Sequence, residues 1–101
     1  MLRFQRMVRV KRDKMEQAKE YAKQINAHLS SHHLGANFRA FTGFLGPGFT
    51  MYFTHEFESL AGLESWMEKI HADADLSKLR AKEAELFVDG TIQDTLMRSL
   101  E

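Results

Sequence analysis

The chain has 101 residues, of which 44% are hydrophobic and 28% charged, and its 14 basic and 14 acidic residues give a formal net charge of zero. This length fits one domain spanning residues 1–101. The neutral balance argues against nucleic acid as a partner, because phosphate binding needs a basic surplus. No cysteine is present, which excludes disulfides and thiol chemistry.

No stretch of the sequence approaches the roughly 20 apolar residues that a membrane span requires. The arginine-rich N-terminus also lacks the apolar core of a signal peptide. We therefore expect a cytoplasmic protein with neither a membrane nor a nucleic acid as partner.

The first third of the chain predicts a strand followed by a helix. Residues 2–11 alternate in polarity, as a half-buried strand does. Asp13 and Glu16 then have the spacing of a capping box, and apolar residues recur at steps of three and four over residues 15–29. We expect the helix to fade near residues 30–33 and to stop at Gly35. The mostly apolar face of the strand carries Phe4, Arg6, Val8 and Val10.

Residues 38–57 predict a hairpin of two phenylalanine-rich strands joined at Gly46-Pro47-Gly48. A two-residue loop would pair Ala40 with His55 and place Arg39 opposite Glu56, so that unlike charges face each other. One face would then carry Phe38, Phe44, Met51, Phe53, His55 and Phe57. The other would carry Arg39, Phe41, Leu45, Tyr52 and Glu56.

Two further helices and a last strand complete the chain. Ser59 is placed to cap a helix whose apolar stripe is Leu60, Leu63, Trp66, Met67 and Ile70. Asp75 is placed to cap another helix that extends toward Phe87. Residues 91–99 predict a weaker strand.

This order of elements predicts an α+β fold of the ferredoxin-like βαββαβ type, with helices covering one face of a four-stranded antiparallel sheet. Either assignment of faces leaves apolar side chains on the uncovered side of the sheet. Exposed apolar area of that kind usually marks an interface. A second copy of the chain would cover it, which predicts a homodimer in which two sheets form one α/β barrel.

The phenylalanine-rich hairpin, together with the segment ESWMEKIH at residues 64–71, resembles the dimeric α/β-barrel superfamily. The pattern is similar to its antibiotic-biosynthesis-monooxygenase and NIPSNAP-like branches. The resemblance implies a homodimer with a pocket between helices and sheet in each subunit. The superfamily includes cofactor-independent oxygenases, haem-degrading enzymes, isomerases and members without known activity, so the fold leaves the function open.

The haem-degrading branch combines a Trp, a His and an Asn near the first strand. Trp66 matches the Trp of that pattern, but residues 1–12 contain no Asn, and His71 follows Trp66 too closely. We therefore expect no haem and no other cofactor. We also expect no metal, because His32 and His33 have no carboxylate or third histidine at a defined spacing in the sequence.

Two functional hypotheses remain. In the first, an enzyme binds a small apolar or aromatic molecule, and His55 or His71 transfers a proton. Its ligand-binding residues would be Arg39, Tyr52, Phe53 and Trp66. In the second, the aromatic surface serves a non-catalytic ligand-binding or assembly module, because no catalytic motif stands out.

Overall fold

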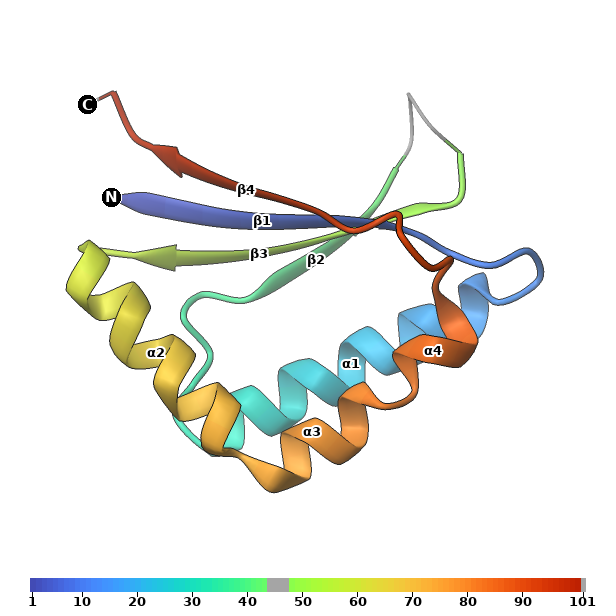
Figure 1. The fold of residues 1–101 in the computed structure, drawn as a ribbon, viewed down its shortest axis with the longest axis horizontal. Coiled ribbons are helices and arrows are strands. Elements are labelled where there is room, and N and C mark those ends of the chain that lie inside the picture. The colour runs from blue at the N-terminus through green and yellow to red at the C-terminus, as the bar shows by residue number, and fades with distance from the viewer. Residues whose placement is uncertain (44–47, 101) are drawn as a thin grey trace.

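The computed structural model describes residues 1–43 and 48–100 and confirms the predicted ferredoxin-like α+β fold. The strands form one antiparallel sheet in the order β2-β3-β1-β4. Figure 1 shows all the helices on one side of this sheet. The elements are β1 (Leu2–Arg9), α1 (Met15–Ser31), β2 (Arg39–Thr42), β3 (Thr50–Phe57), α2 (Leu60–Ala72), α3 (Ala74–Arg80), α4 (Glu83–Leu86) and β4 (Gln93–Arg98).

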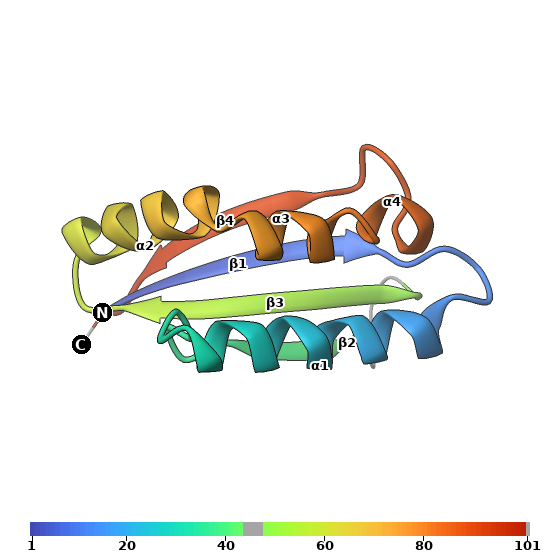
Figure 2. The ribbon, with the colours of Figure 1, turned by 90° about the horizontal axis from the view of Figure 1, so that it is seen from below.

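The helices form two rows on the sheet. Figure 2 shows α1 running along the β2 and β3 side, while α2, α3 and α4 follow one another along the β1 and β4 side. The alternation of β1 and β3 turns Val8 and Met51, each 1% exposed, toward these helices. Facing them are the buried α1 residues Ala18, Tyr21, Ala22, Ile25 and Leu29. The core therefore lies between the sheet and both rows.

The hairpin faces were predicted correctly, but its register was wrong by two residues. Arg39 pairs with Thr54 and Thr42 with Met51. Gly43 donates its N–H to the carbonyl of Thr50 at 2.9 Å, and seven residues separate β2 from β3 instead of two. The predicted turn at Gly46-Pro47 lies outside the described residues. A shift of two keeps every side chain on its face, because side chains alternate with a period of two.

The shifted register overturns the predicted pair of Arg39 and Glu56. Glu56 instead accepts a hydrogen bond from the Arg3 guanidinium of β1 at 3.1 Å. The Arg39 guanidinium lies over the Phe41 ring, 5.0 Å from its centroid. Glu56 is thus paired with Arg3 of β1, and the charge of Arg39 lies against the aromatic ring of Phe41.

The ends of α1 also differ from the prediction. Asp13 adopts a left-handed conformation with φ of 66°, so Lys14 precedes the helix and no side chain caps it. At the other end, His33 takes a left-handed conformation with φ of 56°. Leu34 donates its N–H back to the carbonyl of Leu29 at 2.7 Å, the bond of a Schellman motif. The chain therefore leaves the helix at His33, two residues before Gly35.

The second row begins as predicted and breaks at a different aspartate. Ser59 Oγ accepts the N–H of Gly62 at 3.1 Å and caps α2, as expected. Asp73, rather than Asp75, caps α3, because its Oδ1 accepts the N–H of Leu76 at 3.0 Å. The Asp73 cap places a kink between α2 and α3 (Figure 1).

The sheet face away from the helices is uncovered in the single chain. We call the face that carries Met7, Phe41, Tyr52 and Met97 the open face. Phe41 is 42% exposed and Met97 38%. No helix in the described part of the chain is long and apolar enough to cross a bilayer.

Candidate active site

A cavity of about 170 Å³ lies between the two rows of helices and the sheet. Its floor comes from alternate residues of β1 and β3, and its walls come from the inner sides of the helices. The alternation that buries Val8 and Met51 also turns the residues two and four positions away from them into the cavity. The lining includes Phe4, Arg6, Phe53 and His55 from the sheet, Tyr21, Ile25 and Leu29 from α1, and Leu63, Trp66, Ile70 and His71 from α2.

His55 lies at the centre of an aromatic enclosure. The imidazole is 6% exposed, and its ring centroid lies 4.4 Å from that of Trp66 and 5.1 Å from that of Phe38. Phe4 and Phe57 lie farther out, each with its ring centroid 6.4 Å away. His55 Nδ1 is buried and has no hydrogen-bond partner among the described residues. A buried nitrogen of this kind costs free energy unless another molecule satisfies it.

Burial lowers the pKa of His55 to about 4, because the charged imidazolium loses its hydration in this enclosure. The backbone of Gly35 opposes this shift, and the positive charge of Arg6 adds slightly to it. The imidazole is therefore neutral at physiological pH, with one ring nitrogen able to accept a proton.

Trp66 is held in place by a polar contact as well as by packing. Its indole Nε1–H donates to the carbonyl of Leu34 at 2.8 Å, which joins α2 to the loop after α1. Its ring also lies 5.2 Å from that of Phe57. Trp66 thus forms a fixed wall of the cavity beside His55.

A second group of lining residues is polar. Arg6 makes two hydrogen bonds to the Asp94 carboxylate of β4, at 2.8 and 2.9 Å. The Tyr21 hydroxyl donates to Glu83 of α4. Burial is the larger cause that raises the pKa of Tyr21 well above its usual range, and the Glu83 carboxylate raises it further. Arg80 approaches the same carboxylate at 3.8 Å. The cavity therefore combines an aromatic part around His55 with a polar part whose charges are paired.

The structure brings together four of the six residues that the sequence suggested for the site. His55, His71, Trp66 and Phe53 all line the cavity, with His71 exposed at its edge. Tyr52 and Arg39 do not reach it, because both lie on the open face of the sheet. Strand alternation accounts for this division, since Tyr52 and Phe53 are neighbours in β3 and point to opposite sides.

Sequence reasoning missed the polar part of the cavity. Arg6 could have been found, because it is the one charged residue on the apolar face of its strand. The contact between Tyr21 and Glu83 joins residues 62 positions apart and leaves no pattern in the sequence.

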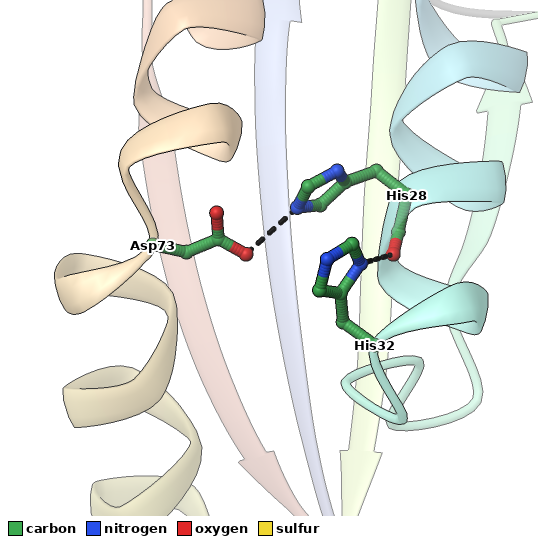
Figure 3. Close-up of side chains that lie close together, drawn as sticks. All are labelled: His28, His32 and Asp73. Atoms are coloured by element: carbon green, nitrogen blue, oxygen red, sulfur yellow. Dashed lines mark hydrogen bonds and ion pairs between the residues drawn. The ribbon is translucent and has the colours of Figure 1, made fainter.

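A second missed group lies at the outer end of the helix rows. His28 Nε2 lies 2.7 Å from Asp73 Oδ2, and His32 stacks on His28 with ring centroids 4.1 Å apart (Figure 3). His28 and His32 are four residues apart on α1, a spacing that places both on one helix face. The carboxylate that the sequence did not supply comes from the kink between α2 and α3.

Comparisons with known proteins agree on the fold. A scan against protein-family models and a search of curated proteins found no match. A NIPSNAP family protein of unknown function from Agrobacterium tumefaciens superposes with a TM-score of 0.81 at 18% identity, over 98% of this chain and 87% of that one. A second NIPSNAP family protein from this organism gives 0.82 at 14% identity, over 99% and 93%.

A crystal structure described as an antibiotic biosynthesis monooxygenase gives a TM-score of 0.71 at 14% identity and covers both chains completely. Sequence identities this low support a shared fold and do not establish a shared activity. The resemblance inferred from the sequence is confirmed at this level: the chain has the ferredoxin-like fold that NIPSNAP and antibiotic-biosynthesis-monooxygenase structures share.

Proposed function

We propose that the chain is a cofactor-independent enzyme that removes a proton from a small aromatic molecule bound beside His55. The observation that carries this proposal is the buried, neutral imidazole whose Nδ1 has no partner among the described residues. A ligand hydroxyl or an acidic C–H in the cavity would supply the missing hydrogen. Functional sites are enriched in groups whose pKa is shifted by burial in this way.

The cavity sets the size of the ligand. An apolar cavity of roughly 150 Å³ is known to hold a benzene molecule. At about 170 Å³ this cavity suits one aromatic ring or two fused rings with few substituents. The rings of Phe4, Phe38, Phe53 and Trp66 offer stacking and edge contacts to such a ligand.

The proposed step transfers a proton from the ligand to His55 Nδ1 and leaves the electron pair on the ligand as a phenolate or enolate. The resulting imidazolium and anion stay close together in a site of low dielectric, where their attraction is strong. In an isomerase, the imidazolium returns the proton to another carbon of the ligand. In an oxygenase, the carbanion reduces molecular oxygen, the co-reactant of that class.

Trp66 provides a direct assay, because it is the chain's one tryptophan and it lines the cavity. Binding of ring-sized phenols, naphthols and cyclic enones is followed by the change in Trp66 fluorescence. Compounds that bind are then tested for exchange of their C–H hydrogens with solvent deuterium and for oxygen consumption. We expect His55→Gln to reduce exchange on a bound compound at least about 100-fold, the contribution of a general base. His33→Ala, on the exposed surface, is the control. Equal exchange rates in the wild type and His55→Gln would refute the role of His55.

The non-catalytic hypothesis makes a different prediction in the same experiment. A binding module would quench Trp66 fluorescence with the same compounds, and every one of them would show no exchange and no oxygen uptake. The complete pairing of Arg6 and Glu83 favours this alternative, because neither charge is free to stabilise a transition state.

We also propose that the working form is a homodimer joined through the open face. Phe41 and Met97 are the most exposed apolar side chains of this face, and Met7 and Tyr52 lie between them. A second sheet packed against this face would bury these side chains, and the cavity would remain on the opposite side.

A further inference from the structure

His28, His32 and Asp73 converge outside the cavity, where the last turns of α1 meet the kink between α2 and α3. Figure 3 shows the three side chains pointing toward one another from two separate segments. One nitrogen of each histidine and one carboxylate oxygen lie within 4.8 Å of one another. None of these residues lines the cavity around His55.

Backbone contacts fix how His32 presents its ring. Its Nδ1 lies 2.9 Å from the carbonyl oxygen of His28, and a carbonyl can only accept a hydrogen bond. The Ser31 hydroxyl lies 2.9 Å from the same Nδ1 and donates its own hydrogen to that carbonyl, so Nδ1 carries a hydrogen and Nε2 keeps a free lone pair. Figure 3 shows this second nitrogen on the side of the ring that faces His28 and Asp73. Metal-bound histidines commonly donate their other N–H to a backbone carbonyl in this way.

Asp73 is held by α3 and directs its second oxygen at His28. Its Oδ1 accepts the N–H of Leu76 as the cap of α3, and its Oδ2 faces His28 Nε2 at 2.7 Å. These two hydrogen bonds hold the carboxylate in place between α1 and α3. A cation would replace the hydrogen now shared between Asp73 and His28.

We propose that His28, His32 and Asp73 form a binding site for a divalent transition-metal ion of the zinc class. Two imidazole nitrogens and one carboxylate oxygen are donors that Zn²⁺, Ni²⁺ and Cu²⁺ accept, whereas Mg²⁺ and Ca²⁺ prefer oxygen ligands. Ligands of a tetrahedral ion lie about 3.3 Å apart, given metal–ligand distances of about 2.0 Å. The three donor atoms lie within 4.8 Å of one another, and a small rotation of the exposed His32 side chain would bring them to this separation.

The proposed ion joins the two rows of helices at this end of the molecule. Three protein ligands leave at least one coordination position for water or a small ligand. Without a metal, His28 and Asp73 form a polar contact across the rows, and His32 contacts its own end of α1. His32 is therefore the residue whose role changes between the two cases.

The test uses tag-free, chelator-treated protein titrated with zinc chloride in a calorimeter. Two variants remove a metal ligand and keep the cap of α3. His32→Ala deletes an exposed ring, and Asp73→Asn keeps an oxygen to cap α3. His33→Ala is the matched control, because His33 is also exposed and adjacent in sequence.

We expect the wild type and His33→Ala to bind one equivalent of zinc with the same affinity. His32→Ala and Asp73→Asn should each weaken binding by more than about tenfold, because even the outer partners of a metal site contribute that much. Zinc should also raise the melting temperature of the wild type but not of the two ligand variants. Affinity unchanged in His32→Ala, or lost in His33→Ala, would overturn the proposal.

Discussion

The rings of His55 and Trp66 lie with their centroids 4.4 Å apart and their planes tilted by 49°. One ring comes from the middle of the sheet and the other from α2, so this contact joins the two layers beside the cavity. It also brings the proposed proton acceptor next to the chain's fluorescent reporter.

The burial of neutral His55 predicts a pH-dependent stability. The unfolded chain binds the proton near pH 6.5, whereas the folded chain binds it only near pH 4. Between these values the unfolded state holds more protons, so the free energy of unfolding falls as the pH decreases. The stability that neutral His55 contributes is present in full above about pH 7, and the free energy of unfolding falls by about 3 kcal/mol by pH 4.

Urea unfolding of the wild type and His55→Phe between pH 7.5 and 4.5 measures this contribution. We expect the difference in stability between the two proteins to shift in favour of His55→Phe as the pH falls. His33→Ala, which changes an exposed histidine, should follow the wild type. Parallel curves for the wild type and His55→Phe would mean that His55 is not buried as a neutral ring.

Replacement of Trp66 by Phe should destabilise the fold through one lost hydrogen bond. The substitution leaves the carbonyl of Leu34 without its indole donor, and Leu34 itself is buried. We expect a loss of about 1–2 kcal/mol, typical of an unsatisfied polar group that is partly buried. Far-UV circular dichroism during urea unfolding measures it without the tryptophan signal.

Met67→Leu is the control for the Trp66 substitution, because Met67 is adjacent on α2 and 42% exposed. Its stability should stay within about 0.5 kcal/mol of the wild type. If the two variants were equally stable, the hydrogen bond to Leu34 would contribute nothing.

Asp94→Asn should free the positive charge of Arg6 beside the cavity. Asp94 is 41% exposed, so the loss of stability is expected to be only about 1 kcal/mol. Ligand selectivity should change more, because the unpaired guanidinium then attracts anions. Titration of Trp66 fluorescence should show tighter binding of ring-sized carboxylates, and no change for neutral phenols of the same size.

Glu16→Gln is the control for Asp94→Asn. It also removes one acidic partner of an ion pair, since Glu16 lies 3.3 Å from Lys19, but that pair is on the surface of α1. Tighter binding of carboxylates by both variants would point to overall charge instead of Arg6.

Phe41→Glu should separate the proposed dimer. Sedimentation of the wild type at micromolar concentration should report about twice the chain mass of 11.7 kDa. A carboxylate buried in the interface is costly to desolvate, so the variant should sediment as a monomer. Leu60→Glu, at the start of α2 on the opposite layer, should leave the dimer intact. A monomeric wild type would contradict the proposal directly.

The part of the site that could be predicted from the sequence depends on periodicity. Alternation along β3 placed Phe53 and His55 on one face, and helical spacing placed Trp66 on the inner side of α2. Both assignments depend only on near neighbours in the chain. They remain correct even though the hairpin register differs by two residues, since such a shift changes partners and not faces.

The rest depends on contacts between distant segments. The partner of Glu56 could not be chosen between Arg3 and Arg39 without the length of the hairpin loop. Asp73 lies 45 residues from His28, and it reaches that side chain only because the second row of helices breaks at the Asp73 cap. Local patterns do not record where such a kink places a carboxylate.

The two rows of helices are joined by polar side chains along their length. Tyr21 contacts Glu83, Gln24 accepts a hydrogen bond from Lys82, and His28 contacts Asp73. Separating the rows would break these contacts and leave the pairing of β1 with β3 intact. We therefore expect the helix layer to open while the sheet stays folded. Amide hydrogens of α3 and α4 should accordingly exchange with solvent faster than those of β1, by a local opening rather than global unfolding.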